Sequence, residues 1–178
     1  EACPLNLAPP SSTTAALVMG DALAIAVLEA KGFTAEEFAF SHPGGSLGKR
    51  LLLRVTDVMV QGDDVPRVAH AATLADALYE MTRKGLGMTT VASAEGALLG
   101  VFTDGDLRRA VEENSDLQTT PLAAVMTEGA RTVTQDLLAA EALSLMERHQ
   151  ISSLVVVDNA SQIVGVVTLL ALLRAGIS

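Results

Sequence analysis

Two stretches of the chain show the same order of apolar and polar positions, and one follows the other at a fixed distance. GVFTDGDLRRA at residues 100–110 aligns with GVVTLLALLRA at residues 165–175, which places Thr168 65 positions after Thr103. The same displacement aligns apolar residues farther upstream, namely Ala77, Leu78 and Met81 with Ala142, Leu143 and Met146. One displacement that recurs over a whole unit predicts an internal repeat.

Each repeat begins with a short extended segment followed by an amphipathic helix. The segments 56–60 and 123–127 each contain a Val-Met pair. Apolar residues then recur at positions i, i+3, i+4 and i+7 from Leu74 and again from Ala139, which is the spacing of one helix face. A Thr-x-x-Asp pattern at residues 73–76 predicts a capping box at the start of the first helix.

Two β-rich runs follow the helix in each repeat, and a second helix closes the unit. The runs are 88–93 and 98–102 in the first copy and 153–158 and 163–167 in the second, with polar turns at 94–96 and 159–161. The closing helices are expected to begin at Thr103 and Thr168. The order β-α-β-β-α therefore occurs twice, and the short uninterrupted valine runs indicate strands that are covered on both faces.

Residues 1 to about 54 have no counterpart in the repeat. Their pattern predicts a helix from about Thr13 to Lys31, then a short helix with a Thr-x-x-Glu capping box at residues 34–37. A Gly/Pro-rich loop is expected at residues 41–50. A segment of this size with one long helix cannot bury a core alone, so we expect it to be the edge of another domain.

Composition and charge exclude several classes of function. Hydrophobic residues make up 49% of the chain and aromatic residues only 3%, so a base-binding pocket would need aliphatic walls. The net charge of −9 and the scattered basic residues argue against nucleic-acid binding. Asp21 and Glu29 interrupt the longest apolar stretch, so no membrane span is expected. A single cysteine, Cys3, excludes an internal disulfide framework and is typical of a reducing compartment.

The Thr-Asp-Gly-Asp sequence at residues 103–106 has two interpretations. The Thr103 hydroxyl and the Asp106 carboxylate could form a capping box at the start of the closing helix. The same two groups could instead hold the two hydroxyls of a ribose, with phosphates near the helix N-terminus and near Arg108 or Arg109. The residues alone favour the cap.

The repeat resembles the cystathionine β-synthase (CBS) domain family, whose members hold ribose at a Gly-h-x-Thr/Ser-x-x-Asp junction. Residues 100–106 match this pattern at every position, whereas the second copy has Ala171 in place of the aspartate. We expect a regulatory ligand, either an adenine nucleotide or, on the logic of feedback by the end product of a pathway, a cytidine nucleotide such as a CMP-sugar. The ligand contacts that the resemblance implies are Thr103, Asp106, Arg109 and Thr168.

The first part of the chain resembles the end of the sugar isomerase (SIS) domain of bacterial D-arabinose-5-phosphate isomerases. The matching strings are EACPLNLAPPSSTTAALVMGDALA at residues 1–24 and FSHPGGSLGKRLL at residues 40–52. In that family an SIS domain precedes a CBS pair, so the resemblance covers all 178 residues. It implies cytoplasmic interconversion of D-ribulose 5-phosphate and D-arabinose 5-phosphate, which supplies 3-deoxy-D-manno-octulosonate for lipopolysaccharide.

Two residues of this first segment are candidates for the isomerisation chemistry. Aldose–ketose isomerisation moves a proton between C1 and C2, which requires a group whose pKa is near the operating pH. His42 is such a group, and the resemblance makes it the active-site acid/base, with Glu1 as a second carboxylate. Ser11 and Ser12 either line this site or cap the following helix. No metal and no required cofactor is expected.

The predicted architecture is α+β, with a tandem CBS pair at residues 55–115 and 120–178 behind a mostly helical remnant of an α/β SIS domain at residues 1–54. The two repeats are expected to pack pseudo-symmetrically, sheet against sheet, with a cleft between them. The resemblance implies self-association through the CBS pairs and a homotetrameric parent enzyme. The chain alone is expected to be inactive because the phosphate-binding loop of the SIS domain lies upstream. An alternative is that the repeats serve only oligomerisation.

Overall fold

The structure is a computed structural model that describes residues 1–5, 7–41 and 45–177. These residues form two compact units, 1–48 and 49–178. His42, the predicted acid/base, lies outside the described residues.

The first unit consists of helices. The helix α1 (Pro10–Ala30) begins with a proline, which suits the first turn because proline has no N–H to leave unpaired. The helix α2 (Ala35–Ser41) begins after the expected capping box, in which the Glu37 amide donates to the Thr34 hydroxyl over 3.2 Å. The prediction of a loop through residue 50 is wrong, because α3 (Ser46–Leu52) is helical. Its Leu, Lys and Arg residues are strong helix formers.

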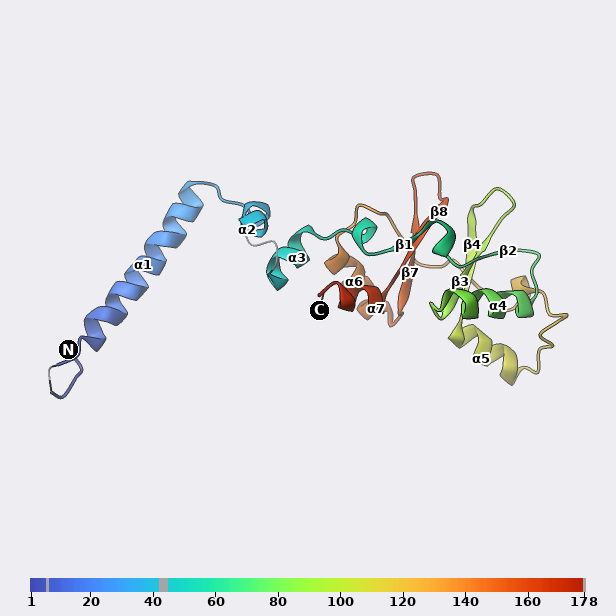
Figure 1. Ribbon diagram of the computed structural model, residues 1–178, viewed down its shortest axis with the longest axis horizontal. Helices are drawn as coiled ribbons and strands as arrows, with labels where there is room; N and C mark the ends of the chain where they lie inside the picture. Colours follow the sequence, from blue (N-terminus) through green and yellow to red (C-terminus); the bar gives the residue numbers. More distant parts are fainter. Residues whose placement is uncertain (6, 42–44, 178) are drawn as a thin grey trace. The chain divides into compact units, whose positions relative to one another are not determined.

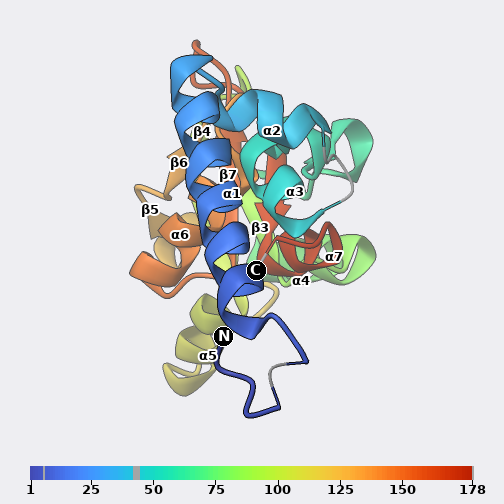
Figure 2. The ribbon, with the colours of Figure 1, turned by 90° about the vertical axis from the view of Figure 1, so that its left-hand side faces the viewer.

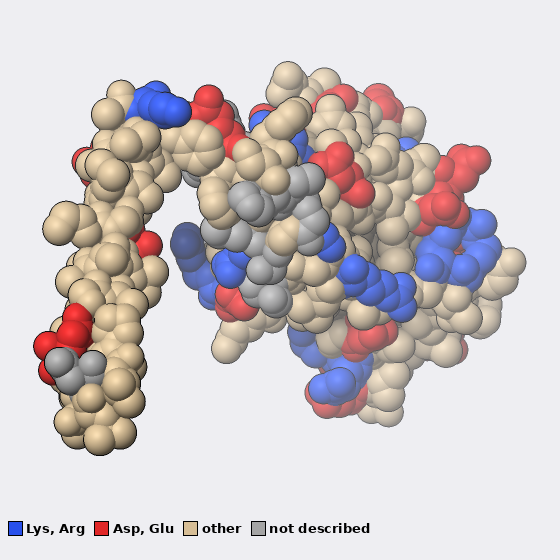
Figure 3. All heavy atoms as spheres, turned by 60° about the vertical axis from the view of Figure 1, so that its left-hand side comes forward, with Lys and Arg blue, Asp and Glu red and all other residues tan. Residues whose placement is uncertain are grey.

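The long helix α1 is apolar and exposed. It is a single straight helix (Figures 1 and 2), and most of its visible face carries no charged side chain (Figure 3). None of its residues is buried, and Leu17 and Met19 are about 70% exposed, at 67% and 71%. By length and composition α1 could cross a membrane, so the expectation that Asp21 and Glu29 exclude a membrane span stays a prediction. The core helix of a soluble domain has the same length and composition.

The second unit contains two four-stranded sheets and four α-helices (Figure 1). One sheet has the order β2-β3-β4-β5, with β2 (Arg67–Ala69), β3 (Met88–Ala92), β4 (Leu98–Thr103) and β5 (Thr127–Glu128). The other has the order β1-β8-β7-β6, with β1 (Val60–Gln61), β8 (Ile163–Thr168), β7 (Ser153–Val157) and β6 (Thr132–Val133). The helices are α4 (Leu74–Lys84), α5 (Asp104–Glu112), α6 (Ala139–His149) and α7 (Leu169–Arg174). Each repeat contains the predicted β-α-β-β-α elements in that order, but a further short strand, β1 or β5, precedes them, so the observed order is β-β-α-β-β-α.

Each repeat contributes its first strand to the sheet of the other repeat. Strand β1 pairs antiparallel with β8, and β5 pairs antiparallel with β4. The segment before β1 also crosses over, since the Ala139 amide donates to the Leu53 carbonyl over 2.8 Å. The leads into β1 and β5 contain short 3₁₀ turns, Val55–Asp57 and Leu122–Ala124, so the expectation that they are extended is wrong there.

A shared core joins the two sheets. It contains Val65, Met88 and Ala92 from the first repeat and Val155, Ile163 and Val166 from the second. Every residue of β3 is buried. In the valine run of β7, Leu154, Val155 and Val156 are buried in succession, and successive residues of a strand point to opposite faces, which confirms the prediction that the valine runs are covered on both faces.

The glycine of each junction motif lies beneath a methionine of the other repeat. A Cβ atom added at Gly165 would lie 2.6 Å from the Met59 sulfur and 2.8 Å from the Val60 carbonyl oxygen. A Cβ atom at Gly100 would lie 2.6 Å from the Thr127 carbonyl oxygen and 3.1 Å from the Met126 sulfur. The exchanged strands therefore require glycine at both positions.

We expect Gly165→Ala to lower the free energy of unfolding by about 1–3 kcal/mol, because the added methyl group overpacks the contact with β1. Gly100→Ala should have a similar effect through β5. Gly105→Ala is the control, since its Cβ atom would lie in ordinary contact, 3.5 Å from the Thr103 hydroxyl, and alanine favours a helix. Denaturant titration measures all three, and equal stability of Gly165→Ala and Gly105→Ala would contradict the strand exchange.

Candidate functional site

A cavity of about 480 Å³ lies between the two repeats, within the size range of small-molecule sites. It is lined by four segments, which lie in residues 87–88, 101–109, 127–131 and 150–155. Three of the residues predicted as ligand contacts, Thr103, Asp106 and Arg109, line this cavity together. The predicted cleft between the repeats is therefore present at the predicted junction.

The junction between β4 and α5 is held by a capping box. Thr103 is the last residue of β4, and its amide and hydroxyl donate to Asp106 Oδ2 over 2.8 and 2.6 Å. The Asp106 amide in turn approaches the Thr103 hydroxyl at 3.4 Å. The local sequence therefore determines the conformation of the β4–α5 junction, because a Thr-x-x-Asp pattern satisfies amides that the first helical turn leaves unpaired.

The other oxygen of Asp106 binds residues outside the capping box. Asp106 Oδ1 accepts a hydrogen bond from the Thr127 hydroxyl over 2.7 Å and a charged one from the Arg109 guanidinium. Thr127 belongs to β5, so this bond joins the helix of the first repeat to a strand contributed by the second. Asp106 is only 2% exposed, and a buried carboxylate needs such partners.

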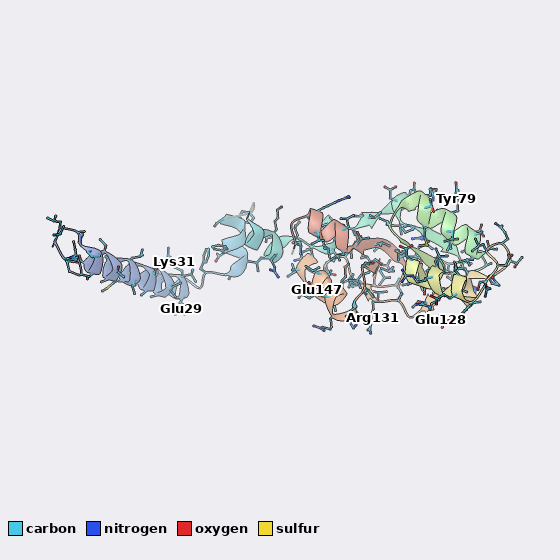
Figure 4. All side chains as sticks on the ribbon, turned by 90° about the horizontal axis from the view of Figure 1, so that it is seen from below. Glu29, Lys31, Tyr79, Glu128, Arg131 and Glu147 are labelled. Carbon is cyan, nitrogen blue, oxygen red and sulfur yellow. The ribbon has the colours of Figure 1, made fainter. Side chains whose placement is uncertain are left out.

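The walls of the cavity combine aliphatic and polar groups. Met88, Val101 and Val155 supply apolar surface, and none of the described residues that line the cavity is aromatic. Asp104 and Arg131 add one charge of each sign. In Figure 4 the labelled Arg131 lies between the orange α6 and the yellow α5. The cavity can therefore accept a ligand with an apolar ring, hydroxyl groups and an anionic group.

The junction of the second repeat lies elsewhere. Thr168 caps α7, where its hydroxyl accepts from the Ala171 amide over 3.2 Å. It lines a separate hollow of about 360 Å³ together with Leu169, Leu170 and Leu173. Leu169 and Ala171 align with Asp104 and Asp106 of the first repeat, so this hollow has an apolar wall where the first cavity has carboxylates. The structure does not bring Thr168 together with the other predicted contacts.

The carboxylate of Glu1 lies at the N-terminus of α1. The Ser11 amide donates to it over 2.8 Å, and both the amide and the hydroxyl of Ser12 also donate to it. The hydroxyl bond from Ser12 lowers the pKa of the Glu1 carboxyl below its usual value. Ser11 and Ser12 thus bind Glu1 at the start of the helix, and the pairing of Glu1 with His42 stays a prediction.

Thr127 and Arg131 are among the cavity residues that were not predicted from the sequence. Thr127 directly follows the second Val-Met pair, where the first repeat has Val60. The repeat alignment carried no signal that this segment crosses to the other sheet. Only the pairing of β5 with β4 places its hydroxyl beside Asp106.

Comparison with known proteins supports the fold. The CBS domain profile matches residues 55–113 and 122–178. The solved structure of an uncharacterized conserved protein from Pyrococcus horikoshii matches with a TM-score of 0.63 at 24% identity, covering 71% of this chain and 93% of that one. A CBS domain protein from Pyrobaculum aerophilum, solved in complex with AMP, matches with a TM-score of 0.61 at 21% identity, covering 67% and 89%.

Curated proteins match over nearly the whole chain. The arabinose 5-phosphate isomerase KdsD of Pseudomonas aeruginosa is 59% identical over 177 residues, which are 99% of this chain and 54% of that protein. The KdsD of Escherichia coli K12 is 54% identical over the same lengths. The chain therefore spans about half the length of the curated relatives that it matches. With both of its repeats matched by the profile and by the solved structures, the chain belongs to the CBS domain family.

Proposed function

We propose that the cavity at Asp106 binds a ribonucleotide and that the CBS pair acts as a nucleotide-sensing module. The observation that carries this proposal is the buried Asp106 carboxylate on the wall of a cavity of about 480 Å³. Within the described part of the chain, its Oδ1 atom accepts hydrogen bonds from two side chains alone, Thr127 and Arg109, and both are exposed. A pair of ribose hydroxyls can replace such donors without disturbing the backbone.

The base of the ligand is either adenine or cytosine. Aliphatic walls at Met88, Val101 and Val155 can cover one face of either base. AMP is bound by the similar Pyrobaculum aerophilum protein, which favours adenine at the level of the fold. A cytidine nucleotide such as a CMP-linked octulosonate is the second candidate, because it would be an end product of the 3-deoxy-D-manno-octulosonate pathway expected from the resemblance to D-arabinose-5-phosphate isomerases, and an end product is a natural feedback ligand.

Calorimetric titration of the chain with AMP, ATP, CMP and CMP-linked octulosonate tests this proposal. We expect one of them to bind with a stoichiometry of one per chain, because the hollow at Thr168 lacks the carboxylate. Arabinose 5-phosphate is the control ligand, since it carries a phosphate but no base. If none of the nucleotides releases or absorbs heat, the proposed function is wrong.

We also propose that the chain is the C-terminal part of an arabinose 5-phosphate isomerase, which the 59% identity over 177 residues supports. The CBS pair would then regulate interconversion of D-ribulose 5-phosphate and D-arabinose 5-phosphate in a cytoplasmic homotetramer. We expect no turnover of ribulose 5-phosphate by this chain alone, because substrate must be positioned by groups upstream of it. Turnover by the purified chain would overturn this expectation. The matched control is the chain joined to an upstream SIS domain.

An alternative function is oligomerisation without a ligand. It is favoured by one observation, namely that protein groups already satisfy both oxygens of Asp106. In that case Asp106 would serve only as a cap and as a link to β5. The Asp106 variant described below distinguishes the two functions.

A further inference from the structure

The two carboxylate oxygens of Asp106 accept hydrogen bonds from different parts of the protein. Oδ2 accepts the amide and the hydroxyl of Thr103, and Oδ1 accepts Thr127 and Arg109. A carboxylate offers about four acceptor positions, so the group is saturated within the protein. A ligand cannot simply add its hydroxyls to Asp106, and it must displace donors that are already present.

The donors on Oδ1 are the ones that can leave. The Thr103 amide on Oδ2 is backbone and belongs to the cap of α5, so its release would unravel the first turn of the helix. The Arg109 side chain is 62% exposed, and Thr127 is exposed as well. Both can turn toward solvent or toward a ligand at little cost to the fold.

The charges around the cavity decide what kind of ligand can displace Arg109. Asp104 and Asp106 balance Arg109 and Arg131 among the residues that line the cavity. A neutral diol that takes Oδ1 breaks the Arg109–Asp106 ion pair and leaves the guanidinium without an anion. A ligand that also carries a phosphate gives the released guanidinium a new partner, and arginine binds phosphate well.

We propose that Thr127 and Arg109 occupy the acceptor positions of Asp106 Oδ1 that ribose hydroxyls would take, and that a ligand binds only by displacing both hydrogen bonds. The two ribose hydroxyls replace Thr127 and Arg109 on Oδ1, and the 5′-phosphate takes the guanidinium of Arg109. The site therefore selects 5′-phosphorylated ribonucleotides over nucleosides and over 2′-deoxynucleotides. This inference rests on the proposed nucleotide-binding function and adds the exchange that sets its specificity.

Titration calorimetry with AMP, adenosine and 2′-deoxy-AMP, and in parallel with CMP, cytidine and 2′-deoxy-CMP, tests the exchange. In the unsubstituted chain the ribonucleotide should bind at least about tenfold more tightly than its nucleoside and its 2′-deoxy form. Thr127→Val removes one competing donor and keeps the shape of the side chain. It should tighten binding of nucleotide and nucleoside alike by about three- to tenfold.

Arg109→Gln removes the charge that the phosphate is expected to receive. The preference for the monophosphate over the nucleoside should fall toward unity, because nucleoside binding no longer breaks an ion pair. Arg108→Gln is the matched control, since Arg108 is the neighbouring exposed arginine of α5 and is not among the residues that line the cavity. It should leave the preference unchanged.

The outcomes separate this inference from the proposed function. If neither series binds, nucleotide sensing itself is wrong and the exchange falls with it. If a ribonucleotide binds but Thr127→Val does not tighten binding, or Arg109→Gln weakens nucleotide and nucleoside equally, the exchange alone is wrong. Both substituted side chains are exposed, and circular dichroism verifies that each variant is folded.

Discussion

Replacing Asp106 with alanine is expected to lower the free energy of unfolding by about 2–4 kcal/mol and to abolish stabilisation by the nucleotide. The loss of stability combines a missing helix cap with missing hydrogen bonds to a buried charged group. Bound nucleotide raises the melting temperature only if its affinity survives. Thermal melts with and without AMP or CMP therefore measure both effects on one sample.

Asp76→Ala is the matched control for this variant. Asp76 occupies the same position in the capping box of α4, where its Oδ2 atom accepts the amide and the hydroxyl of Thr73 over 2.8 and 2.9 Å. It does not line the cavity between the repeats. Asp76→Ala should lose stability and keep the full response to nucleotide. An Asp106→Ala protein that keeps its response as well would leave Asp106 with the role of a cap alone.

Replacing Val166 with aspartate is expected to unfold both repeats, at a cost of about 4–5 kcal/mol or more, because it buries an unpaired charge. Val166 is fully buried in β8, belongs to the core shared by the two sheets and pairs with Val60 of β1. A defect in the second repeat should therefore reach the first through the shared core and the exchanged strand.

Tyr79 reports on the first repeat separately. It is the only tyrosine, the chain has no tryptophan, and it lies on α4, so its fluorescence follows one half of the unit. The unfolding transition measured by Tyr79 fluorescence should coincide with the transition measured by circular dichroism. We expect this both in the unsubstituted chain and in Val166→Ala, a milder variant that still folds. A Tyr79 transition that stays in place while the rest of the unit melts would contradict the interlocked fold. Leu170→Asp, at an exposed site on α7, should change stability by less than about 0.5 kcal/mol.

Local patterns predicted the elements of this protein and one half of its candidate site. The capping box at Thr103 and Asp106 is a contact between residues three apart, and such contacts follow from sequence. The valine runs predicted buried strands for the same reason, since burial on both faces leaves a mark in the sequence of the strand itself. The repeat predicted that two such halves would enclose a cleft.

Contacts between distant segments were not predictable in the same way. Strand β5 is two residues long, and its pairing with β4 leaves no periodicity in the sequence, so Thr127 was missed. The prediction of a loop through residue 50 gave more weight to the glycines and the proline of this segment than to the helix formers that follow them, and the structure has helix α3 there instead. Thr168 was predicted as a ligand contact because it aligns with Thr103. An alignment gives the equivalent position in the second repeat, but it does not show that this position lies in a different hollow, which leucines line.

Nucleotide binding at this site requires Asp106 Oδ1 to change partners, from Thr127 and Arg109 to the hydroxyls of a ribose. The most direct measurement is a crystal structure of the chain grown with the nucleotide that titration identifies. We predict one nucleotide per chain in the cavity between the repeats, with a ribose hydroxyl within hydrogen-bond distance of Oδ1 and with Arg109 on the phosphate. A nucleotide bound in the hollow at Thr168, or one bound while Thr127 and Arg109 keep their bonds to Asp106, would contradict the account.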